Sequence, residues 1–124
     1  MRKRLLTLIS CMSLAACQTS FEQSAGLVAQ TAIVDDTGSA VGQARVFERD
    51  AIRTINIAVY PALPGTYRVL LVPETGTQDL QLPDLTVSEE GIGAMSDRLP
   101  ANLSGPVAIR VGERLVSRIE LPVP

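Results

Sequence analysis

From residue 31 onward, apolar and polar side chains alternate with a period of two, which is the pattern of β-strands that bury one face. The clearest case lies between Ile52 and Tyr60, where Ile55, Ile57 and Val59 alternate with polar or small residues. Turn sequences rich in glycine, proline and acidic residues separate such segments. No convincing helical pattern follows residue 30. The predicted strands are 31–35, 40–48, 52–60, 66–72, 85–88, 92–95, 106–111 and 114–121.

Short strands at regular spacing, separated by turns, are typical of an antiparallel β-sandwich or barrel. Residues 31–124 are enough for one domain and too few for two. Residues 18–30 are rich in Gln, Ser, Thr and Ala and show only weak periodicity. We interpret them as a flexible tether in front of the domain.

The first sixteen residues have a different pattern. Arg2, Lys3 and Arg4 form a basic start, and Leu5 to Ala16 is apolar or small and uncharged. Twelve helical residues reach only about 18 Å, whereas the hydrocarbon core of a membrane is about 30 Å thick. A basic start followed by a short apolar run indicates an export signal rather than a membrane span.

The end of this segment predicts a covalent lipid. Leu14-Ala15-Ala16-Cys17 resembles the lipobox of bacterial lipoproteins. That resemblance implies cleavage after residue 16 and acylation of Cys17 through its sulfur and its new amine. Gln18 stands where an aspartate would hold an enteric lipoprotein at the inner membrane, so the resemblance favours the outer membrane, facing the periplasm. The alternative is an ordinary secretory signal that contains two cysteines.

Charge excludes some partners of the mature chain. Removal of residues 1–16 takes away three positive charges and no negative ones, so the formal charge changes from −2 to −5. The remaining chain has eight arginines but no lysine, histidine or tryptophan. An acidic chain without a basic cluster and with few aromatic residues argues against nucleic-acid binding.

Three short motifs along the body point to a family. They are Gly38-x-x-x-Gly42-x-Ala44-x-x-Phe47-Glu48, then Leu63-Pro64-Gly65, then Leu82-Pro83-Asp84-Leu85-Thr86-Val87 ending at Gly91. Together they resemble bacterial copper–zinc superoxide dismutase over most of the body. The fold class that we expect is therefore all-β: a small antiparallel Greek-key β-sandwich or barrel, superoxide dismutase-like or immunoglobulin-like.

The resemblance does not extend to the metal ligands. It places the family's His-x-His copper ligands on Leu70 and Val72, the zinc aspartate on Gln81 and the late copper histidine on Val111. One cysteine of the family's disulfide falls on Ser117. Because the sequence contains no histidine, a copper–imidazole site cannot be built. We expect neither a bound metal nor another cofactor.

The segment 69–72 predicts an exposed apolar patch. It is apolar on both faces of its strand, which usually means that both faces are covered. If Val69 and Leu71 fill the core, Leu70 and Val72 point outward, and the family's covering loops are shortened here to about 74–80 and 112–113. Exposed apolar patches of this kind mark interfaces with a protein partner or a second copy. The patch that we expect comprises Leu70, Val72, Ile109 and Val111; the alternative is a reorganised barrel that buries these residues.

The register of 106–111 contains a conflict. If Val111 faces outward, as the family's histidine does, Arg110 turns into the core. Burial of an unpaired guanidinium is costly. Either the strand slips by one residue, or Arg110 lies near a rim and reaches solvent.

Other catalytic arrangements are weak. A Ser-His-Asp triad needs a histidine, and a Ser-Lys pair would need Lys3, which belongs to the signal. Asp35-Asp36 and Glu89-Glu90 offer carboxylates for acid–base chemistry or Ca²⁺, but we interpret both as turn residues. We therefore expect a membrane-anchored, non-catalytic interaction or structural module. The alternative is an envelope enzyme, either of the superoxide dismutase type or a hydrolase that uses carboxylates alone.

Overall fold

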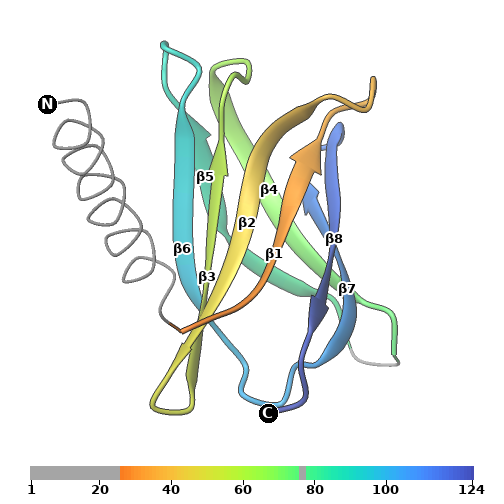
Figure 1. The fold of residues 1–124 in the computed structure, drawn as a ribbon. Coiled ribbons are helices and arrows are strands. Elements are labelled where there is room, and N and C mark those ends of the chain that lie inside the picture. Colours follow the sequence, from red (N-terminus) through yellow and green to blue (C-terminus); the bar gives the residue numbers. More distant parts are fainter. Residues whose placement is uncertain (1–25, 76–77) are drawn as a thin grey trace, which may run out of the picture.

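The computed structural model of the chain describes residues 26–75 and 78–124. The predicted signal sequence, Cys17 and most of the predicted tether lie outside the described residues. The described part contains eight β-strands that form one closed antiparallel barrel (Figure 1). The prediction of an all-β fold with a small antiparallel sandwich or barrel is confirmed.

The strands follow one another along the chain with short connections. They are β1 (Leu27–Val34), β2 (Ala40–Arg49), β3 (Ile52–Val59), β4 (Gly65–Pro73), β5 (Leu80–Val87), β6 (Gly93–Leu99), β7 (Gly105–Val111) and β8 (Leu115–Leu121). No helix in the described ranges is long and apolar enough to cross a membrane.

Around the barrel the strand order is β1-β2-β3-β6-β5-β4-β7-β8. The consecutive strands β4, β5 and β6 have β3 on one side and β7 on the other, which makes two overlapping Greek keys. Two seams are weaker than the other pairings: β1 and β8 align only at Val34 and Val116, and β5 and β6 only at Val87 and Gly93. The barrel is therefore flattened into two four-stranded sheets, β1-β2-β3-β6 and β5-β4-β7-β8, that pack face to face.

Aliphatic side chains fill the space between these sheets. Ile55, Ile57 and Val59 of β3 are buried, as their alternation predicts, and Val69 and Leu71 of β4 meet them from the other sheet. Full burial of one such side chain contributes about 1.5–3 kcal/mol. Both cysteines of the sequence lie outside the described residues. The described barrel is therefore held by apolar burial and strand pairing.

The largest differences from the predicted strand boundaries concern three strands, and the other boundaries agree within one residue. β1 begins at Leu27, so residues 27–30 belong to the barrel rather than to the tether, and Val28 and Ala29 pack against the core. β5 continues through Pro83, which lies at an irregularity in the pairing with β4, where a missing N–H is tolerated. β6 extends to Leu99 although Asp97, which is paired with Ile55, interrupts its apolar alternation.

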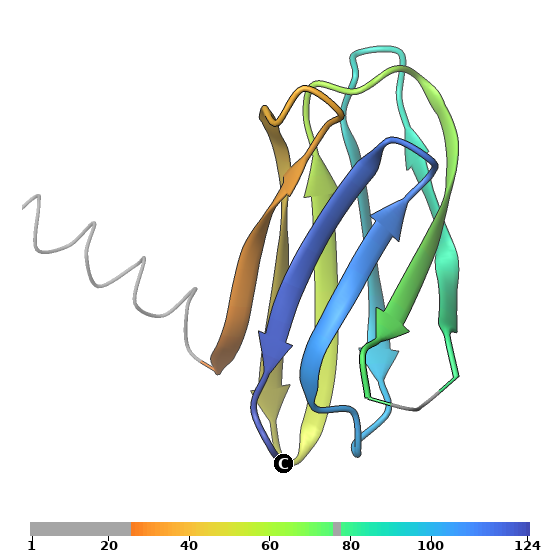
Figure 2. The same ribbon diagram turned by 90° about the vertical axis from the view of Figure 1, so that its right-hand side faces the viewer.

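The two ends of the barrel are made of different loops (Figures 1 and 2). β1 begins at one end, and the chain also ends there after β8, together with the β2–β3, β4–β5 and β6–β7 connections. We call this the N-terminal end. The opposite end, which we call the acidic end, consists of the four remaining connections: 35–39, 60–64, 88–92 and 112–114.

Candidate functional site

The outer face of β4 is the first candidate, because the resemblance places the copper ligands there. Val69 and Leu71 are buried in the core, and Leu70 and Val72 alternate with them, half-buried, on the outer face. The predicted orientation of these four side chains is therefore confirmed. Neither Leu70 nor Val72 offers an atom that binds a metal ion.

The other two members of the predicted patch lie inside the barrel. Ile109 and Val111 are fully buried in the core. The expectation that they join a surface patch is wrong, because β7 follows its own alternation: Val107, Ile109 and Val111 face inward and Arg110 faces solvent. Burial of three aliphatic side chains and hydration of one guanidinium favour this register over the reverse.

The pairing of β4 with β7 shows which residue lies opposite Leu70 on the outer face. Val69 is aligned with Val111 and Leu70 with Arg110, so the outward position opposite Leu70 belongs to Arg110. Of the two ways out of the register conflict, the slip by one residue is the one that occurs. The outer face of this sheet thus combines Leu70 and Val72 with Arg110 and, on β8, with Val116, which is 44% exposed.

The resemblance also aligns Gln81 with the zinc aspartate and Ser117 with a cysteine of the family's disulfide. Gln81 is exposed on β5 and aligned with Leu70. Ser117 lies on β8 at the weak seam with β1, where its hydroxyl donates a hydrogen bond to the carbonyl oxygen of Ala32 at 2.5 Å. The hydroxyl of Thr31 lies 3.1 Å from the same Ser117 oxygen. Ser117 thereby supplements the single aligned backbone pair of this seam.

The carboxylate of Asp35 is part of a turn. Its Oδ1 accepts hydrogen bonds from the Thr37 hydroxyl at 2.6 Å, the Thr37 amide at 2.9 Å and the Ser39 amide at 3.0 Å. The Thr37 hydroxyl first and the Ser39 amide next hold the pKa of Asp35 below its ordinary value, because they stabilise the ionised form. An acceptor held in this way closes the β1–β2 turn and is poorly suited to take up a proton.

The second acidic pair occupies the β5–β6 turn. Hydrogen bonds from the Glu90 amide and then from Ser88 lower the pKa of the Glu90 carboxyl. Within the described part of the chain, no group of three or more His, Cys, Asp or Glu residues is placed to hold a metal ion. The arrangement of these carboxylates therefore favours turn formation over metal binding.

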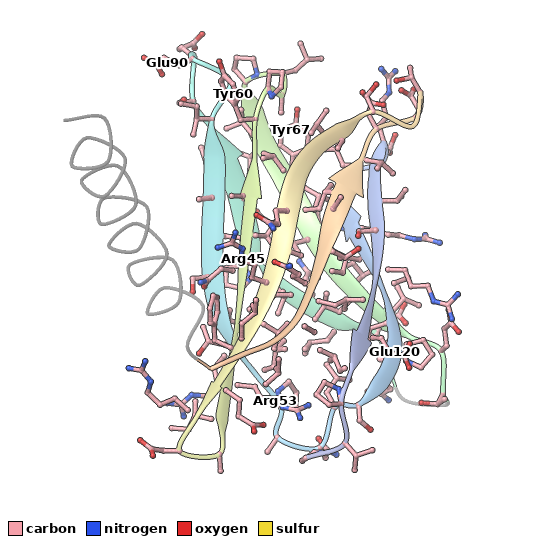
Figure 3. All side chains as sticks on the ribbon, viewed as in Figure 1. Arg45, Arg53, Tyr60, Tyr67, Glu90 and Glu120 are labelled. Carbon is pink, nitrogen blue, oxygen red and sulfur yellow. The ribbon has the colours of Figure 1, made fainter. Side chains whose placement is uncertain are left out.

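The acidic end gathers charge and exposed apolar surface. Its charged side chains are Asp35, Asp36, Glu89, Glu90, Glu113 and Arg114, with a formal charge of −4. Both salt bridges found in the described ranges lie elsewhere. Three large apolar side chains, Tyr60, Leu63 and Ile92, are more than half exposed here. Figure 3 shows Tyr60, Tyr67 and Glu90 at this same end, far from Arg53 and Glu120.

A pocket of about 390 Å³ opens between these loops. Its walls come from the β1–β2, β3–β4 and β7–β8 connections and from the strand ends beside them. Leu63, Tyr67 and Leu115 supply apolar surface. Three carboxylates and one guanidinium also line the pocket, which leaves it a net negative charge: Asp35, Asp36, Glu113 and Arg114. A mostly apolar concavity with a few charged groups is the usual form of a binding site.

Hydrogen bonds fix the loops around the pocket. The Tyr67 hydroxyl donates to the carbonyl oxygen of Leu63 at 2.6 Å, the arrangement of a tyrosine corner. The Ala62 amide donates to the carbonyl oxygen of Gly91 at 3.1 Å, which ties the β3–β4 connection to the β5–β6 turn. The walls are thus held in place without any ligand.

Gly112 brings the β7–β8 turn against the same wall. It has φ +63°, and a Cβ atom there would meet the Tyr67 ring at 2.8 Å. Its amide also donates to the carbonyl oxygen of Arg68 at 2.8 Å. Glycine is favoured at this position for two reasons: it adopts the positive φ without strain, and it has no Cβ atom to collide with the Tyr67 ring.

A larger depression, of about 700 Å³, lies on the outer face of the β1-β2-β3-β6 sheet. Small residues such as Ala32, Ala58 and Ala94 form its floor, and the amide side chains of Gln30 and Gln43 are the polar groups beside them. The ionisable group in its lining is the phenol of Tyr60. The depression offers less chemistry than the pocket at the acidic end.

The sequence alone did not indicate this pocket. Leu63 stands between two prolines in a predicted turn, and residues of turns are often exposed to solvent. An exposed apolar side chain at this position was the local indication of a binding surface. The proximity of Glu113 and Asp36 to Leu63 depends on the pairing of distant strands. No local pattern carries that information.

Comparison with known proteins assigns no family. No model of a known protein family matches the chain, and no curated protein matches it. The lipobox and the likeness to superoxide dismutase therefore stay predictions from the residues themselves.

Proposed function

We propose that the protein is a lipid-anchored component of the bacterial cell envelope. Its barrel acts as a non-catalytic, metal-free interaction or structural module related to superoxide dismutase. Acylated Cys17 holds the protein on the membrane. Gln18 favours the outer membrane, from which the barrel faces the periplasm. More than one acyl chain makes such anchoring stable, since each buried methylene contributes about 0.8 kcal/mol.

The observation that carries the non-catalytic proposal is the chemistry of the outer face of β4 and β7. The resemblance aligns Leu70 and Val72 with the family's two copper ligands of this strand, and the register of β7 brings Arg110 opposite Leu70. A guanidinium has five donor N–H groups, no acceptor and a permanent positive charge. At this position Arg110 repels a metal cation instead of binding it.

The length of the tether supports the anchored arrangement. Since β1 begins at Leu27, nine residues separate it from Cys17, and nine extended residues span at most about 32 Å. The barrel is then held close to the lipid surface by its N-terminal end. The acidic end is the part of the barrel farthest from that attachment.

Intact-mass measurement of protein extracted from membranes tests the anchor. We expect a mature chain that begins at Cys17 and carries the mass of the added acyl chains. Cys17→Ser should leave an uncleaved precursor, whereas Cys11→Ser, a matched change within the signal, should be processed normally. Unmodified Cys17, or cleavage at another bond, would overturn the lipoprotein proposal.

Metal analysis tests the non-catalytic part. The purified protein should contain no stoichiometric copper or zinc and should show no dismutase activity. Treatment with a chelator should leave its thermal midpoint unchanged, because no structural ion contributes to folding. Bound copper or zinc together with dismutase activity would favour the alternative, an envelope enzyme.

A further inference from the structure

We propose that the pocket at the acidic end is a docking site for a protein partner, and that it takes a peptide segment in which basic side chains flank an apolar one. The inference deepens the proposed function by naming the surface and the chemistry of the partner. The inference rests on the proposed function only for the orientation of the pocket relative to the membrane. The binding itself does not require the lipid.

Charge complementarity is the first argument for a basic partner. Five carboxylates and one arginine are gathered on four short turns, and the salt bridges of the described barrel involve none of them. Like charges held together repel one another and raise the local concentration of cations. Lysine or arginine side chains of a partner relieve this repulsion and are steered toward the site.

The pocket itself accounts for the apolar part of the segment. Leu63 is 74% exposed and lies on the rim, while Tyr67 and Leu115 line the interior. A volume of about 390 Å³ is large enough for a large apolar side chain such as leucine or phenylalanine. The flanking residues then meet Asp36 and Glu113, and the carboxylates of the lining outnumber its one guanidinium, that of Arg114.

The extent of the surface favours a peptide segment over a small molecule. Beyond the pocket, Tyr60 and Ile92 are also exposed at this end, where they line one margin of the depression on the β1-β2-β3-β6 sheet; Ile92 belongs to the same turn as Glu89 and Glu90. A ligand confined to the pocket would leave these groups uncovered. A segment that crosses the end of the barrel covers both the pocket and the neighbouring turn.

The site is prepared for binding in two ways. Its walls are fixed by the hydrogen bonds of Tyr67, Ala62 and Gly112, so little conformational entropy is lost when a partner docks. In a protein anchored through Cys17, the lipid is attached at the other end of the barrel. The pocket then opens away from the membrane, toward partners in the periplasm.

Selection of short random peptides displayed on phage tests the proposal, with the full purified protein as the target. We expect the enriched peptides to carry lysine or arginine on both sides of leucine, methionine or phenylalanine. The double variant Asp36→Asn with Glu113→Gln should bind them about tenfold more weakly, since two close charges are lost. Higher salt should weaken binding to the wild-type protein.

The double variant Asp84→Asn with Glu120→Gln is the matched control. It removes the same charge from exposed positions on the outer face of the β5-β4-β7-β8 sheet. This variant should bind the selected peptides as the wild-type protein does. Thermal midpoints of both variants should match that of the wild type, because all four side chains are at the surface. No enrichment, enriched peptides without basic residues, or equal loss of binding in both double variants would overturn the proposal.

These outcomes are independent of the lipid anchor. Failure of the peptide test leaves the mass of the mature chain and the processing of Cys17 untouched. Failure of the lipid test leaves a peptide site on a protein that is not anchored at Cys17. The two proposals therefore fail separately.

Discussion

Both ion pairs of the described barrel lie at its N-terminal end, whereas the charged side chains of the acidic end belong to neither pair. Arg53 is 2% exposed, and its Nε donates to Oε1 of Glu48 at 2.7 Å. Its Nη1 donates to the carbonyl oxygen of Leu103 at 2.9 Å. Nearby, Arg118 is paired with Glu74 at 3.1 Å. The acidic end has a formal charge of −4, and neither of these salt bridges reaches it.

The difference follows from burial. A guanidinium inside the barrel must be paired and hydrogen-bonded, because removal of a charge from water costs several kcal/mol. Arg53 meets this requirement with a carboxylate from β2 and a carbonyl from the β6–β7 connection, so it holds that connection onto the barrel. The carboxylates of the acidic turns stay at the surface, where Asp35 accepts hydrogen bonds only from hydroxyl and amide groups of its own turn, and none of these carboxylates belongs to either ion pair of the described barrel. The N-terminal end therefore contains an ion pair whose guanidinium is buried, whereas the acidic end keeps its net negative charge at the surface.

Replacement of Arg53 should have the largest effect on stability. Arg53→Ala leaves Glu48 without its cation and the Leu103 carbonyl without its donor, and we expect a loss of about 3 kcal/mol in the free energy of unfolding. Urea unfolding measures this loss. Arg49→Ala, a change of an exposed arginine on the same hairpin, should cost less than about 0.5 kcal/mol. Equal losses in the two variants would show that the pairing of Arg53 does not stabilise the N-terminal end.

A smaller effect is expected at the β3–β4 connection of the acidic end, which neutral hydrogen bonds hold in place. Tyr67→Phe removes the bond from the Tyr67 hydroxyl to the Leu63 carbonyl and should lower the free energy of unfolding by about 1 kcal/mol. Tyr60→Phe is the matched control, since Tyr60 is 63% exposed. Thermal unfolding of both variants measures the difference. If Tyr60→Phe is as harmful as Tyr67→Phe, the tyrosine corner does not hold the wall of the pocket.

Much of the fold could be predicted because side chains that face the core alternate with side chains that face solvent along each strand. The alternation of Ile55, Ile57 and Val59 predicts the inner face of β3 correctly. The same alternation, continued two residues back, turns Arg53 inward. The sequence cannot show that Glu48 and the Leu103 carbonyl will compensate this charge, because one of these partners is fifty residues away. Buried ion pairs depend on tertiary contacts.

The error at β7 has a related cause. The likeness to superoxide dismutase turned Val111 outward, although Arg110 beside it argued for the reverse. In the structure Val111 is fully buried and Arg110 is exposed. A charged residue within an alternating strand therefore constrained the register more strongly than short motifs in distant turns. The pocket at the acidic end was out of reach for another reason: its walls come from three connections that only the barrel topology brings together.

The smallest of these effects concerns the pH dependence of the β1–β2 turn. Hydrogen bonds from Thr37 and Ser39 lower the pKa of Asp35 in the folded protein, while in the unfolded chain it has its ordinary value of about 3.9. The ionised carboxylate therefore stabilises the fold above that value, and this contribution is lost as the pH falls through the lower, folded pKa. Thermal midpoints measured from neutral pH down to strongly acidic pH should fall less steeply for Asp35→Asn than for the wild type.

The matched control is Asp36→Asn, which removes the same charge from a neighbour that accepts none of the three hydrogen bonds to Asp35 Oδ1. This variant should keep the wild-type slope. If Asp36→Asn flattens the curve as much as Asp35→Asn does, relief of the overall negative charge is the cause, and the turn of Asp35 contributes no specific stability.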